Sequence, residues 1–128
     1  MSNVNVQIFV ESRYKVNRRK IKTRVEEVIK SRGITSPVEV SVAIVGDRKM
    51  TSLNKKYRNL DKTTNVLSFS QSEGERMAHN SDTMVLGDVV ISYPVMITEA
   101  SAENMLVDDK ICFWVQHGLQ HLLGEHHE

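Results

Sequence analysis

The chain has 128 residues, a formal net charge of +1 and 40% hydrophobic residues, a composition typical of one globular domain. Its single cysteine, Cys112, excludes an internal disulfide, which suits a reducing cytoplasm. The first residues have neither a basic lead nor a long apolar run, and no stretch approaches the length of a membrane span. We therefore expect a single cytoplasmic domain over residues 1–128, without membrane association.

Charge is divided unevenly along the chain. Residues 1–62 hold 15 Lys and Arg against 6 Asp and Glu, a balance of +9, whereas residues 63–128 hold 2 against 10, a balance of −8. A basic half is typical of proteins with an anionic partner, for which RNA is the natural candidate. The alternative is that the basic helices are merely solvated and lie near the acidic half.

Hydrophobic periodicity predicts four strands and four helices. In chain order we expect a strand at 4–10, a helix at about 17–32, a strand at 38–45, a helix capped by Asp47 that ends in the cluster Lys55, Lys56 and Arg58, and a strand at 66–69. After a loop at 71–85 come a strand at 86–92, a helix from Pro94 to about Asn104, and a helix capped by Asp108 or Asp109 that runs to Leu123. The polar face of the first helix carries five cations: Arg18, Arg19, Lys20, Lys22 and Arg24. This pattern predicts an α+β domain in which helices, the last among them, cover a four-stranded mixed sheet.

The segment QHGLQHLLGEHHE, residues 116–128, contains four of the five histidines. His117 and His121 are four residues apart, so their imidazoles project from one side of a helix and can share a metal ion. Gly124 is the type of residue that commonly ends a helix, which lets His127 return to the same ion. The spacing H-x3-H-x2-G-x2-H is that of the metzincin zinc site, and three imidazoles leave a fourth position for water.

These residues predict one bound zinc ion on His117, His121 and His127, at the end of the last helix and in the tail that follows. The alternative is that the histidines are ordinary surface residues, and imidazole also suits other divalent metals. Metzincins carry a glutamate base directly after the first histidine, where this chain has Gly118. A peptidase without that base would be badly impaired, so we expect a different reaction at a similar metal site.

Three stretches together resemble one family. HGLQHLLGEHH is similar to the H-G-x-x-H-L-x-G-x-D-H signature of the YbeY-type endoribonucleases, TTNVLSFS to their T-[DN]-V-L-S-F-P stretch, and LGDVVIS to their L-G-D-[IV]-x-I-S strand. The resemblance runs from about residue 40 to the end of the chain. Two positions depart from it, since His126 replaces the family aspartate and Ser70 the family proline.

The resemblance implies a zinc-bound cytoplasmic hydrolase that acts on single-stranded RNA in the maturation of ribosomal RNA, in partnership with the small ribosomal subunit. It assigns the zinc ligands to His117, His121 and His127, and it includes an arginine that matches Arg58. A metal ion on three neutral histidines can lower the pKa of a bound water towards about 7.

Arg58 is the candidate catalytic residue, because a guanidinium can contact phosphate oxygens through two hydrogen bonds. The alternative is a solvated arginine at the end of a basic helix. Asp88 is either a buried strand carboxylate or a partner of a histidine. The second candidate function is a metal-stabilised RNA-binding or ribosome-assembly module with little or no nuclease activity.

Overall fold

The computed structural model describes residues 3–11, 13–71 and 83–124. Its elements follow the chain as β1 (Val4–Val10), α1 (Arg18–Ser31), β2 (Val38–Val45), α2 (Asp47–Arg58), β3 (Val66–Ser70), β4 (Met84–Ser92), α3 (Tyr93–Ala102) and α4 (Val107–Leu122). Their types and order confirm the sequence prediction. Strand β4 begins two residues earlier than expected, inside the predicted loop, and residues 72–82 of that loop lie outside the described residues.

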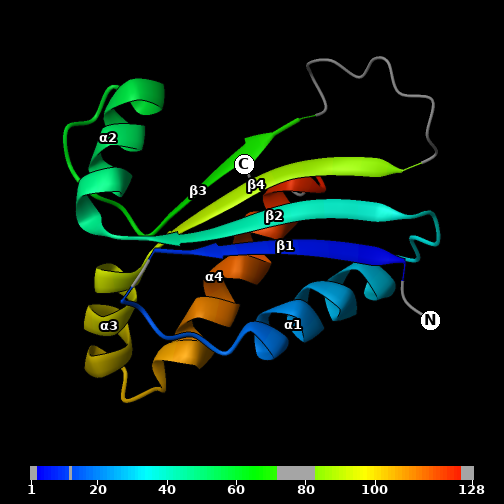
Figure 1. Ribbon diagram of the computed structural model, residues 1–128, viewed down its shortest axis with the longest axis horizontal. Coiled ribbons are helices and arrows are strands. Elements are labelled where there is room, and N and C mark those ends of the chain that lie inside the picture. Colours follow the sequence, from blue (N-terminus) through cyan, green and yellow to red (C-terminus); the bar gives the residue numbers. More distant parts are fainter. Residues whose placement is uncertain (1–2, 12, 72–82, 125–128) are drawn as a thin grey trace.

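The four strands form one mixed sheet in the order β1-β2-β4-β3 (Figure 1). The pairs β1/β2 and β2/β4 are parallel, whereas β3 pairs with β4 antiparallel and forms an edge. The predicted α+β class and mixed sheet are therefore confirmed. No helix within the described ranges has both the length and the apolar character needed to cross a membrane.

The two faces of the sheet carry separate cores. Side chains alternate along a strand, so the residues of β2 point in turn to opposite faces. On one face, α1 and α4 pack together over the larger cluster, which includes Val42 and Val89. On the other face, α2 packs over a smaller cluster made of Val45, Met50, Leu67 and Val90, with Phe69 beside it. The histidine helix thus lies across one face of the sheet, and the basic α2 lies on the other.

The helix starts correct two of the predicted caps. Asn17 caps α1, because its side chain accepts a hydrogen bond from the backbone of Lys20 at 3.0 Å. The expected cap of α4 was wrong: the helix starts at Val107, and Asp108 instead accepts a hydrogen bond from the backbone N–H of Asn17.

The cap predicted for α2 was also wrong. Gly46 precedes the helix and Asp47 is its first residue. The Asp47 carboxylate accepts hydrogen bonds from the hydroxyls of Ser92 and Thr63, both at 3.1 Å. These bonds tie the start of α2 to the end of β4 and to the segment that leads into β3.

The basic face predicted on α1 is partly an internal contact. Lys20 forms an ion pair with Asp109 on α4, and this hydrogen-bonded carboxylate raises the pKa of the lysine. Arg24 donates to the side chain of Gln116 at 3.1 Å, and Arg18 donates to a backbone carbonyl of β1 at 2.9 Å. These three cations are therefore engaged within the protein, and for Lys20 the partner is the acidic start of α4, as the alternative stated above expects.

Candidate metal centre

One side of α4 carries a stripe of four side chains that interact in sequence. Lys110, Trp114, His117 and His121 are spaced by four, three and four residues, which places them on one side of the helix. The Trp114 ring meets the His117 ring edge-on, with centroids 4.9 Å apart, and the His117 and His121 centroids lie 4.8 Å apart. The predicted histidine pair is therefore assembled on the described part of α4.

The geometry of this pair fits a shared metal ion. Zinc binds imidazole nitrogen at about 2.0–2.1 Å, which sets each ring centre about 3 Å from the ion and two ring centres about 5 Å apart at a tetrahedral angle. The observed separation is 4.8 Å, with ring planes inclined by 51°. His121 is exposed and His117 half-buried, so the pair is accessible from solvent.

The third predicted ligand, His127, lies outside the described residues, as do His126 and the isolated His79. Within the ranges that are described, no group of three or more His, Cys, Asp or Glu side chains gathers around one point. The structure thus brings together two of the three predicted ligands, and the role of His127 stays a prediction.

Gly118 is needed for the contact between α4 and the sheet. A Cβ atom at this position would lie 2.8 Å from Cγ1 of Val89 and 3.0 Å from Oγ of Ser68. The Ser68 hydroxyl donates to the Gly118 carbonyl at 3.2 Å, which fixes α4 on β3. A glutamate at this position would collide with β3 and β4, which explains in physical terms why the metzincin base is absent here.

A partly buried polar network supports the histidine side of α4. Glu99 on α3 accepts a hydrogen bond from Nε1 of Trp114 at 2.7 Å and another from Nδ2 of Asn65 at 3.2 Å. Lys110, only 5% exposed, lies 3.8 Å from Glu99 and 2.8 Å from Glu103. The members of this network come from three separate segments that no spacing links, so the network could not be predicted from the sequence.

Arg58 is the last residue of α2, and its side chain is exposed. Helix α2 contacts β4 and α3, whereas α4 lies on the other face of the sheet (Figure 1). Strand β3 connects the two regions: the Tyr57 ring packs on Phe69 with centroids 4.9 Å apart, and the adjacent Ser68 bonds Gly118 on α4. The structure therefore places Arg58 near one side of the edge strand β3 and the helix of His117 and His121 against the other.

Asp88 is placed away from His117 and His121, the two histidines that the structure describes. It pairs with Phe69 and Ser41 across neighbouring strands and is half-buried. The next residue, Val89, faces α4, so alternation puts Asp88 on the opposite face of the sheet. Of the two alternatives for this residue, a partly buried strand carboxylate is the one that agrees with the fold.

Cys112 is packed in the larger core with no exposed surface. Burial raises the pKa of its thiol above the ordinary value, because an apolar environment disfavours the thiolate. Cys112 therefore contributes to the packing of this core.

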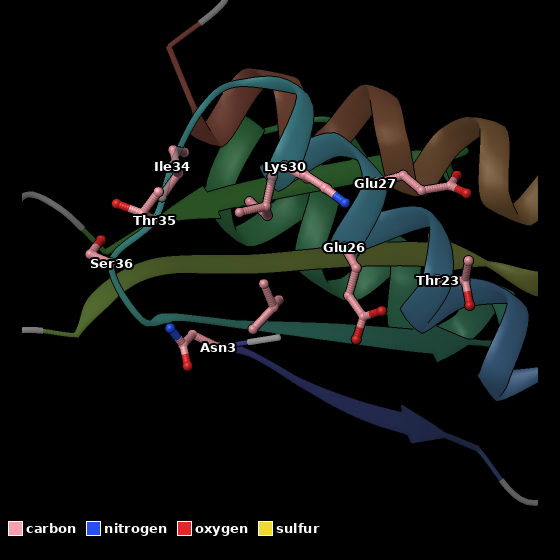
Figure 2. A pocket seen from close by; sticks show the side chains of 10 residues that line it. Asn3, Thr23, Glu26, Glu27, Lys30, Ile34, Thr35 and Ser36 are labelled. Atoms are coloured by element: carbon pink, nitrogen blue, oxygen red, sulfur yellow. The ribbon is translucent and has the colours of Figure 1, made fainter. Parts of the chain in front are cut away.

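A hollow of about 540 Å³ opens between α1 and the start of β1 (Figure 2). Glu26, Glu27 and Lys30 line it from α1, and Asn3 and Thr35 from the adjoining segments. None of its lining residues belongs to the histidine stripe, and its two carboxylates against one ammonium do not suit a phosphate. It is therefore separate from the candidate metal centre.

Comparison with known proteins places this site in a family. A sequence model of the family described as Endoribonuclease YbeY matches residues 7–128. The chain is 37% identical over 103 residues to the endoribonuclease YbeY of Pelotomaculum thermopropionicum, and the aligned region covers 80% of this chain and 68% of the relative. It is 36% identical over 118 residues to the endoribonuclease YbeY of Syntrophus aciditrophicus, with 92% and 72% covered.

The solution structure of TM1509 from Thermotoga maritima is similar in fold. It superposes with a TM-score of 0.60 at 24% identity, over 96% of this chain and 75% of that one. At this identity the likeness supports the fold alone, whereas the sequence matches extend over the histidine stripe, Arg58 and Gly118. The chain belongs to the YbeY endoribonuclease family.

Proposed function

We propose that this protein is a zinc-dependent endoribonuclease that cleaves single-stranded RNA. Its proposed role is the maturation of ribosomal RNA and the quality control of the small ribosomal subunit in the cytoplasm. The observation that carries the proposal is the family match over residues 7–128, which contains the whole histidine pattern. The relatives are named endoribonucleases, and the 4.8 Å separation of the His117 and His121 rings suits a shared ion.

In this proposal His117, His121 and His127 hold the metal. A zinc ion bound by three neutral histidines supplies positive charge beside a phosphodiester and activates water at neutral pH. The chain's own contribution is to fix the ligands: Trp114 packs against His117, and the close contact of Gly118 with the sheet holds α4 on β3. Arg58 contributes a planar guanidinium that can bind phosphate oxygens through two hydrogen bonds.

The test compares RNA cleavage by the zinc-loaded protein, by the protein after chelation, and by the chelated protein after zinc is restored. Cleavage should disappear with the metal and return with it. His117→Ala and His121→Ala should each lose most bound zinc by elemental analysis, because each removes one of three ligands. His127→Ala should do nearly the same, while His126→Ala should keep one zinc per chain.

Two results would count against this proposal. Cleavage that survives complete zinc removal would refute metal dependence. RNA binding without cleavage by the zinc-loaded protein would instead favour the second candidate function, a metal-stabilised RNA-binding module.

A further inference from the structure

The solvent face of α2 is predominantly basic. It carries five exposed cations: Arg48, Lys49, Lys55, Lys56 and Arg58. The only acidic residue of the helix, Asp47, is exposed at its start and accepts hydrogen bonds from the hydroxyls of Ser92 and Thr63. The five cations outnumber this one carboxylate, so a polyanion is the partner that complements the face.

Helix α1, the other basic helix, is less suited to binding a polyanion. On α1, Lys20 is paired with Asp109, and Arg24 with Gln116 and Glu27. Arg18 donates to a backbone carbonyl of β1, which leaves Arg19, Lys22 and Lys30 as the other exposed cations of the helix. The hollow beside α1 adds two carboxylates to that region. Positive charge available to a ligand is thus concentrated on α2, although the sequence alone indicated α1 as well.

An aromatic surface adjoins the basic face of α2. The Tyr57 ring is 55% exposed and rests on the half-buried Phe69 of β3, with centroids 4.9 Å apart and planes inclined by 59°. The ammonium of Lys56 lies 5.2 Å from the centroid of the Tyr57 ring. Proteins that bind single-stranded nucleic acid combine such a basic surface with aromatic rings on which bases stack.

We infer that α2 and Tyr57 form the surface that holds single-stranded RNA, with phosphates on the helix cations and a base stacked on the Tyr57 ring. The inference rests on the proposed function for the nature of the substrate. An acidic protein segment would also complement the cations, but an exposed aromatic ring that packs at an angle against a second ring favours a nucleobase.

The first test separates the two basic helices. A labelled oligouridylate of about 12 nucleotides, within the usual site size, is bound to the zinc-loaded protein over a series of salt concentrations. Anisotropy gives the affinity, and the recovered oligonucleotide is checked for integrity. Lys49→Ala with Lys56→Ala should weaken binding about 10-fold at low salt and flatten the plot of log K against log salt by about 1.4, if each lysine neutralises one phosphate.

The matched control is Arg19→Ala with Lys22→Ala on α1, which removes the same charge from exposed positions. This control should lower the RNA affinity, and change the slope of log K against log salt, less than the α2 pair does. If the α1 pair weakens binding as much as the α2 pair, the assignment of the RNA surface to α2 is wrong.

The second test concerns the ring. Tyr57→Phe should bind like the parent, while Tyr57→Leu should bind about 5-fold more weakly or worse with an unchanged salt slope, because a stacking contact carries no charge. Thermal denaturation verifies that both variants are folded. Parent-like binding by Tyr57→Leu would overturn the stacking contact, and displacement of the RNA by polyglutamate at equal charge concentration would assign the face to an acidic protein segment instead.

Cleavage by the parent protein distinguishes failure of this inference from failure of the proposed function. If the parent protein shows zinc-dependent cleavage and the α2 variants bind RNA normally, only the assignment of the RNA surface to α2 is refuted. If the parent protein cleaves no RNA but the α2 variants lose RNA binding, the assignment of the RNA surface to α2 is supported and the proposed nuclease activity is refuted.

Discussion

Arg58 combines two features that are separable by substitution, its charge and its planar shape. It lies at the exposed end of α2, and no described contact makes it necessary for the core. Its loss should therefore affect the reaction more than the fold.

We expect Arg58→Ala to keep its zinc content and melting temperature but to cleave single-stranded RNA about 100-fold more slowly, because phosphate charge in the transition state loses a fixed donor. Arg58→Lys should recover only part of the rate, since an ammonium cannot make the paired contact. Single-turnover rates at saturating protein measure the effect separately from binding. A parent-like rate in Arg58→Ala would show that the residue is a solvated cation.

Glu99 is the residue that links three segments behind the histidines. It holds Trp114, which touches His117, and it also holds Asn65 at the start of β3 and balances the buried Lys110. Glu103 shares only the last of these contacts and is half exposed, which makes it a natural control.

We expect Glu99→Gln to lower zinc affinity about 10-fold, the lower end of what loss of an outer partner of a metal ligand costs. The neutral amide is a weaker acceptor for Trp114, so the orientation of the ring beside His117 becomes less fixed. Trp114 is the only tryptophan of the chain, and its emission during zinc titration reports this site directly. Glu103→Gln should leave both affinity and emission close to those of the parent; an equal effect of the two variants would contradict a specific role for Glu99.

At the scale of elements, α4 is held on the sheet by an approach that only glycine allows. The absent side chain of Gly118 leaves room for Val89 and for the hydroxyl of Ser68. Because Val89 belongs to the closely packed larger core, it has little freedom to move away.

Gly118→Ala should therefore destabilise the protein by about 1–2 kcal/mol. Overpacking costs about 1–3 kcal/mol, and the better helix propensity of alanine offsets up to about 1 kcal/mol. Urea denaturation measures the change. In a Val89→Ala background the same substitution should become neutral or stabilising, and a cost that persists there would show that overlap with Val89 is not its cause.

Sequence patterns predicted the elements well where one periodicity was strong. The alternation of β2 and the apolar stripe of α1 defined both elements to within a residue or two. The caps of α2 and α4 were wrong because Asp47 and Asp108 bond to partners distant in the sequence, and capping rules consider only local donors.

The candidate site was predictable only in part for the same reason. The spacing of His117 and His121 specifies a pair on any helix, so the pair could be recognised from the sequence alone. The Glu99 network and the pairing of α1 with α4 arise from tertiary packing, which no local spacing encodes.

At the scale of the whole molecule, the central sheet separates two cores of unequal size. The larger one joins α1 and α4 to one face, and the smaller one holds α2 on the other through Met50 and a few strand residues. The proposed metal site and the inferred RNA surface consequently depend on different sets of packing contacts.

Because the two cores differ in size, the protein should not unfold as one cooperative unit. Helix α2 buries fewer apolar side chains than α1 or α4, so it should detach in a partial unfolding that leaves the rest of the domain folded. We expect the backbone amides of α2 to exchange with deuterium at a lower free energy of opening than those of α4, and bound oligouridylate to slow exchange mainly in α2. Exchange of both helices at the same free energy would indicate a single cooperative unit. A face that yields in this way can adapt to the irregular path of a single strand, while His117 and His121 keep their positions on the more stable side.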